Sequence, residues 1–197
     1  MSNRSESTKK KILEAARRLL IQRGFHGVAM AEIARDASVS RQAVYLHFRS
    51  KPELLVAMAE YGDREAGVPE ILSRLSQATT PAEIVNAGVA AYAEIQPRIH
   101  DIATVVYAAR QSDPAAEAAW QNRMAARRTG IKHDMERLQR EGALAEGWTA
   151  DAAADLVWSL LSLHTYEYLV VERGWPIDQF VERLQEILRR ALLNRDT

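Results

Sequence analysis

The chain has 197 residues, of which 47% are hydrophobic and 26% charged, with a formal net charge of zero and no cysteine. This composition is typical of a soluble globular protein, and the lack of thiols excludes disulfides, a cysteine nucleophile and a Cys-ligated zinc site. Charged residues interrupt the first apolar run, 12–21, and no run of about 18 apolar residues follows, so we expect no signal peptide, no membrane span and a cytoplasmic protein.

The zero net charge hides a division along the chain. Residues 1–55 hold eleven Lys and Arg side chains against five Asp and Glu, a net charge of +6, so the remainder carries −6. A basic first quarter indicates a part that meets a polyanion, although a merely solvated basic face would look the same.

Cap residues and apolar spacing predict four helices in the first third of the chain. The first spans Thr8 to Arg23 and ends at a glycine, and the second runs from about Met30 to Asp36. Ser40 is the expected N-cap of a third helix to about Phe48, and the S-x-x-E sequence at 50–53 predicts the start of a fourth. Gly and Pro at 67–69 should break this fourth helix.

Helical spacing continues to the end of the chain. We expect helices from Pro81 to about Gln96, from Pro97 onward, and from Pro114 to about 141. A helix from Thr149 to about Glu172 is apolar on almost every face, and a last helix begins at 177. The prediction is an all-α protein of about nine helices, without repeats or strands.

The last two helices carry a large apolar surface, which a chain this short has few ways to cover. Paired across a two-fold axis they would form a four-helix bundle, lined by Leu160, Leu163, Leu184 and Leu188, which predicts a homodimer. The alternative is a buried central helix within a monomer.

The second and third helices, separated by residues 37–39, have the lengths and the turn of a helix-turn-helix. Ile33-Ala34, Ala37-Ser38-Val39-Ser40, Val44 to Phe48 and Ser50 to Leu55 resemble the signature of TetR-type transcriptional regulators, over roughly 11–55. The resemblance implies a homodimer with a three-helix DNA-binding head, residues 1–50, and a larger helical bundle body, residues 51–197, that dimerises and binds an effector.

The predicted contacts with double-stranded DNA are Lys9, Lys10, Lys11, Ser40, Arg41, Gln42, Tyr45, His47 and Lys51. The three lysines are expected in the first turn of helix one, where the helix dipole disfavours cations. Binding of DNA phosphates would offset this unfavourable interaction. Arg41 can read guanine and Gln42 adenine. For Tyr45, His47 and Lys51, contact with the DNA backbone is implied by the resemblance.

The sequence departs from the family pattern in two places. Ser38 stands where a turn glycine is usual, which costs strain but leaves the fold intact. Val28 and Ala29 replace the usual hydroxyl residues before helix two, which removes an N-cap and a phosphate contact.

Aromatic and polar residues within otherwise apolar helices predict an effector site in the body: Tyr92, Tyr107, Trp120, Trp158, His164 and Tyr166. Each could also be a core residue whose polar tip has a protein partner. Gln96, Arg110 and Gln111 are weaker candidates.

No cofactor or metal is expected, because His164 with Glu167 and His133 with Asp134 do not complete a ligand set. No catalytic motif occurs in a context that would bring its residues together as a site, so we do not expect an enzyme. The prediction is a repressor that binds a palindromic operator as a homodimer and is released by a small, mainly apolar effector. A constitutive regulator without an effector and, less favoured, an α-helical enzyme are the alternatives.

Overall fold

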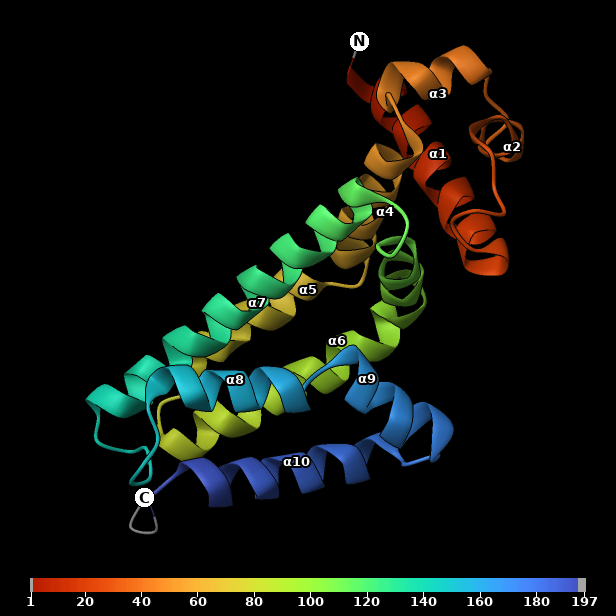
Figure 1. The fold of residues 1–197 in the computed structure, drawn as a ribbon. Coiled ribbons are helices and arrows are strands. Elements are labelled where there is room, and N and C mark those ends of the chain that lie inside the picture. The colour runs from red at the N-terminus through yellow and green to blue at the C-terminus, as the bar shows by residue number, and fades with distance from the viewer. Residues whose placement is uncertain (1, 195–197) are drawn as a thin grey trace. The chain divides into compact units, whose positions relative to one another are not determined.

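The computed structural model describes residues 2–194, and this part of the chain contains ten α-helices and no β-strand (Figure 1). Leu144 and Leu193 form an isolated antiparallel bridge. The all-α prediction is confirmed. The helices are α1 (Ser2–Arg23), α2 (Met30–Asp36), α3 (Arg41–His47), α4 (Lys51–Glu65), α5 (Val68–Ser73), α6 (Pro81–Ala109), α7 (Pro114–Arg140), α8 (Ala150–Leu160), α9 (Leu163–Tyr166) and α10 (Ile177–Leu192), with a 3₁₀ turn at Arg74–Gln77 and a π-helical turn at Glu167–Glu172.

The predicted helix boundaries near the N-terminus are confirmed where a cap was named. Gly24 adopts a left-handed φ of 69° after α1, and Gly67 does so between α4 and α5. The Ser50 hydroxyl accepts from the Glu53 backbone N–H at 3.3 Å, and the Glu53 carboxylate accepts from the Arg49 N–H at 2.8 Å. Each cap satisfies a backbone group that the helix end leaves unpaired.

The start of α1 is earlier than predicted. The helix begins at Ser2 instead of Thr8, so the lysines at 9–11 lie about two turns inside it and not in its first turn. The dipole argument for a phosphate partner therefore loses its force, because that effect decays within one turn.

One expected helix boundary is wrong at Pro97. The segment forms a single helix, α6, with Pro97 inside it, where we expected one helix to end and another to begin. A proline removes one backbone hydrogen bond, and apolar residues buried on both sides, including Val89, Ala93, Ile102 and Val106, outweigh that loss.

The opposite correction applies between 149 and 172. The expected single helix is interrupted at Leu161, whose ψ of 56° leaves the helical region. Ser162 then caps α9 by accepting the Thr165 backbone N–H at 3.2 Å. A serine hydroxyl competes with the helix for backbone donors, and this competition ends α8.

The described chain packs into two compact units. The first comprises the residues up to Ala66 together with Ile99–Asn122, and the second comprises Gly67–Arg98 together with the chain from Arg123 onward. This is a division by packing, and the functional boundary at residue 50 remains a prediction.

In the first unit, α1 packs against α2, α3 and α4 over a core that includes Ile12, Leu20, Ile33, Val44 and Phe48. Gly62 of α4 lies so close to α6 that an added Cβ would meet the Ile102 side chain at 2.3 Å. The second unit has its own core, centred on α6, α7, α8 and α10, with Val89, Leu138, Ala153, Phe180 and Leu188 among its buried members.

Candidate nucleic-acid interface and effector site

The turn between α2 and α3 has the left-handed residue that the helix-turn-helix requires. Ser38 is the one described non-glycine residue with positive φ, at 56°. Its N–H donates to the Arg35 carbonyl at 3.1 Å, and the Val39 N–H donates to the Ala34 carbonyl at 2.9 Å. The expectation that a serine adopts this turn without loss of the fold is confirmed.

Helix α3 presents one buried and one exposed face. The Ser40 hydroxyl accepts from the Ala43 N–H at 3.1 Å, and Val44 with Phe48 lies in the core. Because those two residues fix the rotation of a seven-residue helix, its outward face consists of Arg41, Gln42, Tyr45 and Leu46.

The outward face of α3 combines a cation with apolar surface. Leu46 is 80% exposed and Tyr45 41% exposed. The Arg41 guanidinium lies 5.6 Å from the centre of the Tyr45 ring. Arginine reads guanine edges, and an aliphatic side chain contacts the thymine methyl group, so this face suits the major groove of DNA. The predicted set of DNA contacts did not include Leu46, which the structure places on the same exposed face.

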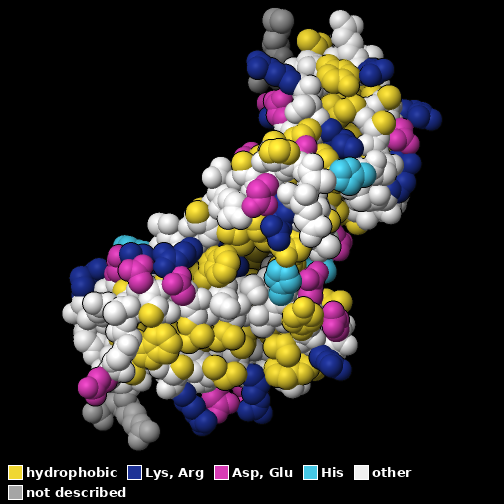
Figure 2. All heavy atoms as spheres, viewed as in Figure 1, with side chains coloured by type: hydrophobic (Ala, Val, Ile, Leu, Met, Phe, Trp, Pro, Cys, Tyr) yellow, Lys and Arg dark blue, Asp and Glu magenta, His cyan; other side chains and the backbone are white. Residues whose placement is uncertain are grey.

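Positive charge surrounds this face. Among the described residues, Lys9, Lys11, Arg41 and Arg49 form no ion pair, whereas Lys10 lies 3.9 Å from Glu14. The nearby phenol of Tyr61 and the carboxylates of Glu65 and Glu14 raise the pKa of Lys10. Figure 2 shows Lys and Arg side chains on the surface of the N-terminal helices, in the upper part of the view.

Lys51 has a structural role in addition to its predicted backbone contact. Its ammonium donates to the Phe25 and Val28 carbonyls at 2.6 and 2.8 Å and lies 4.3 Å from the centre of the Phe25 ring. Burial lowers the pKa of Lys51. Two of its three N–H groups are thus engaged, and one remains for a phosphate. His47 is half-buried, with its ring against Phe48.

A carboxylate replaces the missing hydroxyl cap of α2. No side chain of Ala29 caps the helix, but the Glu32 carboxylate accepts from the Ala29 N–H at 2.8 Å and from Arg23 at 2.9 Å. The Ala29 N–H and Arg23 together lower the pKa of Glu32. Glu32, three residues after the cap position, was the sequence signal that could have predicted this cap. Its negative charge disfavours a phosphate at this corner.

The predicted effector residues fall into both packing units. In the first unit, the Tyr107 and Trp120 rings meet edge to face with centres 5.1 Å apart, and Arg110 lies 4.1 Å from the Tyr107 ring centre. In the second unit, Tyr92 and Tyr166 both pack against Phe180, with ring centres 6.2 Å apart in each pair. Each pair forms a local aromatic cluster.

Several polar tips in the second unit have protein partners. The Tyr92 hydroxyl donates to the Ser162 carbonyl at 2.7 Å, and burial raises its pKa. The Trp158 indole N–H donates to the Met124 carbonyl at 3.3 Å. His164 is exposed. These positions are compatible with a core role as well as a ligand role, so the effector set stays a prediction.

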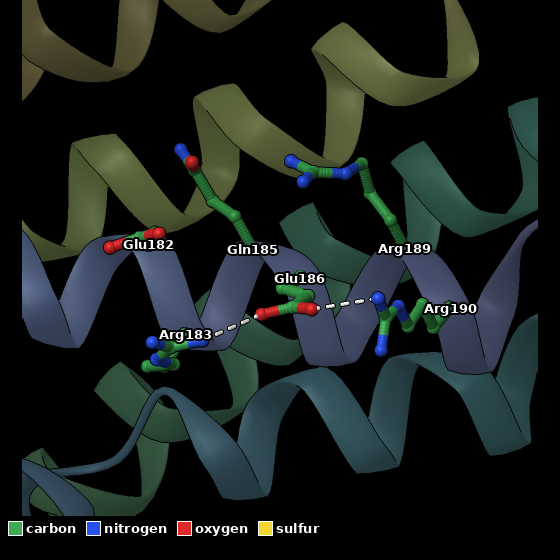
Figure 3. Close-up of a pocket in the computed structure, with 6 residues that line it drawn as sticks. All are labelled: Glu182, Arg183, Gln185, Glu186, Arg189 and Arg190. Atoms are coloured by element: carbon green, nitrogen blue, oxygen red, sulfur yellow. Dashed lines mark hydrogen bonds and ion pairs between the residues drawn. The ribbon is translucent and has the colours of Figure 1, made fainter.

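A surface groove on α10 contains none of the predicted effector residues. Figure 3 shows its lining, in which Glu186 lies between Arg183 and Arg190 at 3.1 and 2.9 Å. Gln185 and Arg189 both bond Asn86 of α6. Its ionic groups largely satisfy one another, which makes it a poor ligand site. Among described residues, no cluster of three or more His, Asp or Glu side chains could hold a metal ion.

The apolar surface predicted for the last two helices is present, but on other residues. Leu163, Leu184 and Leu188 are buried within their own chain, and Leu160 is half-buried. Exposed apolar side chains on this part of the chain are Ile187, Tyr168 and Val171, all at least half exposed. Figure 2 shows hydrophobic side chains gathered over α8 to α10. No described helix is long and apolar enough to cross a bilayer.

The sequence model for "Bacterial regulatory proteins, tetR family" matches residues 12–58. The transcriptional regulator AcrR of Shigella flexneri is 34% identical over 67 residues, which cover 34% of this chain and 31% of AcrR. For the curated relatives YerO of Bacillus subtilis and AcrR, the chain therefore spans only 18–31% of their own length. These relatives are named as regulators and not as enzymes.

Solved structures extend the likeness over the whole chain, at the level of fold. NalD, the secondary repressor of the MexAB-OprM multidrug efflux pump in Pseudomonas aeruginosa, has a TM-score of 0.77 at 22% identity, covering 98% of this chain and 100% of NalD. The regulator FadR from Bacillus subtilis, in complex with stearoyl-CoA, has a TM-score of 0.76 at 16% identity, covering 92% of this chain and 98% of FadR.

Proposed function

We propose that this chain, whose N-terminal module belongs to the tetR family of bacterial regulatory proteins, is a cytoplasmic, ligand-responsive transcriptional repressor. The observation that carries the proposal is α3, whose core face is locked by Val44 and Phe48 while Arg41, Gln42, Tyr45 and Leu46 project outward. Side chains at the N-terminal part of a recognition helix read base edges in the major groove.

The proposed assembly is a homodimer. The partly exposed apolar surface of α8 to α10 is the proposed interface, because burying Ile187, Tyr168 and Val171 removes apolar area from water. A two-fold dimer would place two α3 helices in successive major grooves, about 34 Å apart, on a palindromic operator.

The proposed effector site lies among the aromatic residues of the body. The FadR neighbour is described in complex with stearoyl-CoA, which supports a ligand-binding body in this fold. Release of DNA by a hundredfold requires the effector to favour the DNA-incompetent state by about 2.7 kcal/mol.

The first test is selection of a binding site from a random duplex pool, followed by titration of the selected duplex at increasing salt. A palindromic consensus and a steep fall of affinity with salt are expected, because each phosphate contact releases counterions. Arg41→Ala should lose base preference, with Arg128→Gln as a control on α7. Absence of any duplex binding, or affinity independent of salt, contradicts the proposal.

The second test separates a responsive regulator from a constitutive one. A thermal-shift screen of small molecules is followed by titration of each hit into the protein–operator complex. A hit that lowers operator affinity is expected. If every hit leaves operator affinity unchanged, the chain is a constitutive regulator and the effector part of the proposal is wrong.

A further inference from the structure

Arg127 of α7 is a half-buried cation with no carboxylate partner among the described residues. Its guanidinium lies 5.1 Å from the centre of the Tyr92 ring, and one N–H approaches the Trp158 carbonyl at 3.5 Å, longer than an ordinary hydrogen bond. Burial lowers the pKa of Arg127, Tyr92 partly offsets this effect, and the charge of Arg123 adds to it. The site is therefore electropositive and poorly solvated.

The acidic side chains of α8 pair with Arg128, the residue next to Arg127, and not with Arg127 itself. Arg128 bonds Asp155 at 2.7 Å and Asp151 at 3.3 Å, and Lys132 bonds Asp151 at 2.8 Å. All of these side chains are at least one-third exposed. Successive residues of a helix point about 100° apart, so Arg127 faces a different direction from this ion-pair network.

Another side chain of the second packing unit, on α6 near Tyr92 in the sequence, has a hydrogen-bond donor without a partner. Gln96 is the one buried polar residue among those described, with 5% of its surface exposed, and its amide nitrogen is buried without a hydrogen-bond partner. It follows Tyr92 by four residues, so the two share a helix face. A buried donor without a partner destabilises the fold, and a ligand that accepts a hydrogen bond from it would recover that free energy.

The aromatic rings around Arg127 supply apolar surface and few hydrogen-bond acceptors for its guanidinium. Tyr92 and Tyr166 pack on Phe180, and the Tyr92 hydroxyl already donates to Ser162. Trp158 donates its indole N–H to Met124. Around Tyr92 lie the Arg127 cation, an unpaired amide N–H and aromatic faces, together with the Glu167 carboxylate, whose charge adds to burial in raising the pKa of Tyr92. Glu167 forms no ion pair with Arg127, so the guanidinium and the amide N–H still complement a negative group on an apolar body.

We infer that the effector of this chain is an apolar organic anion, whose charged group pairs with Arg127 and accepts from Gln96 while its body packs on the rings around Tyr92. The inference rests on the proposed function and names the ligand class of its site. The charged group is a carboxylate, sulfonate or similar oxyanion, because a guanidinium binds two oxygens of such a group at once.

The test uses two fluorescent probes that differ only in charge. 8-Anilinonaphthalene-1-sulfonate carries a sulfonate, and N-phenyl-1-naphthylamine is its neutral counterpart. Dissociation constants of both are measured by fluorescence titration for the wild type, Arg127→Met, Arg127→Lys and Arg128→Gln. We expect Arg127→Met to weaken the sulfonate probe at least tenfold without weakening the neutral probe, and Arg127→Lys to restore part of the affinity.

Arg128→Gln is the matched control, because it removes a cation one residue away that already has two carboxylates. It should leave both probes within about twofold of the wild type. A thermal melt of each variant verifies folding, and Arg127→Met should melt no lower than the wild type because it removes a desolvated, unpaired charge. Equal loss of both probes in Arg127→Met, no loss of the sulfonate probe, or no binding of that probe to the wild type overturns the inference.

Operator binding in the presence of the sulfonate probe separates the two proposals. If the probe binds through Arg127 but operator affinity does not change, the anion site stands and the effector role fails. If uncharged compounds release the operator equally well from the wild type and Arg127→Met, the effector role stands and the inference that the effector is an anion is wrong.

Discussion

The N-terminal module and the rest of the chain differ in how closely they match known proteins. Residues 12–58 match a family model, and a segment of 67 residues is 34% identical to AcrR, whereas the chain as a whole has the fold of NalD at 22% identity. The N-terminal module is specified by caps, a turn and a few core positions, which are short, local signals. A helical body is specified mainly by apolar volume and spacing, which many sequences satisfy.

Polar interactions do not divide the two regions in the same way. In the N-terminal module, the helix caps at Ser40 and Ser50 are satisfied within a few residues. Buried polar side-chain atoms without a hydrogen-bond partner occur in both packing units, with the Tyr61 hydroxyl in the first and the Gln96 amide nitrogen in the second. Arg127 differs from both, because it is a half-buried cation without a carboxylate partner among the described residues.

The largest expected effect distinguishes core from interface on α10. Leu184→Glu should destabilise the second packing unit by more than about 4 kcal/mol, because it buries a charge without a partner at a position 3% exposed. Ile187→Glu, at a position 50% exposed, should leave the free energy of unfolding within about 0.5 kcal/mol of the wild type and shift the proposed homodimer toward monomer. Urea unfolding and analytical ultracentrifugation measure the two effects. A folded Leu184→Glu monomer would contradict this assignment of the two faces.

The next effect tests whether α3 reads bases. Arg41→Ala should cost about 1–3 kcal/mol of operator binding at a guanine position and relax preference there. Lys51→Met should weaken all duplexes alike and also lower thermal stability, because it removes two hydrogen bonds to the 25–28 segment. Competition titrations with single-base operator variants provide the measurement. If the base preference of Arg41→Ala equals that of the wild type, Arg41 does not read a base and the prediction is wrong.

A smaller effect concerns the strained turn. Ser38→Gly should raise stability by about 1 kcal/mol, because glycine adopts a φ of 56° without the steric cost that a side chain carries. Ser38→Ala is the control and should give no such gain. Chemical denaturation of the three proteins measures the difference, and a loss of stability in Ser38→Gly would show that the serine hydroxyl matters more than its backbone angle.

The smallest effect is a pH dependence at the start of α6. The Glu83 carboxylate accepts from the Thr79 and Thr80 N–H groups and from the Thr79 hydroxyl, which lowers its pKa to about 2. A lowered pKa adds stability above the ordinary value of 4.5, and this stability is lost as the pH falls toward 2.

The measurement is the melting temperature of the wild type and Glu83→Gln from pH 7 to pH 2. The gap between them should be widest above about pH 5.5 and should close toward pH 2. Glu60→Gln, at an exposed position of α4, is the control. A gap that stays constant with pH would show that the amide caps as well as the carboxylate and that charge plays no part.

Local signals in the sequence determined the helix-turn-helix, its caps and the tetR resemblance. A cap or a turn acts over three or four residues, so Ser40, Ser50, Gly24 and Gly67 could be interpreted without knowing what surrounds them. The resemblance predicted the strained conformation of Ser38, because a turn glycine is usual at that position of the family.

Tertiary structure decided the features that depend on distant partners. Packing on both sides keeps α6 continuous through Pro97, while Ser162 interrupts a helix that apolar content alone predicted to run on. Spacing could not tell that Leu184 is core and Ile187 exposed, because both lie on one wide apolar stripe. The sequence could not show that Arg127 lacks a carboxylate partner, because the carboxylates of α8 pair with Arg128 and Lys132 only in the folded chain. The partners of a residue are set by the fold and not by its neighbours in sequence.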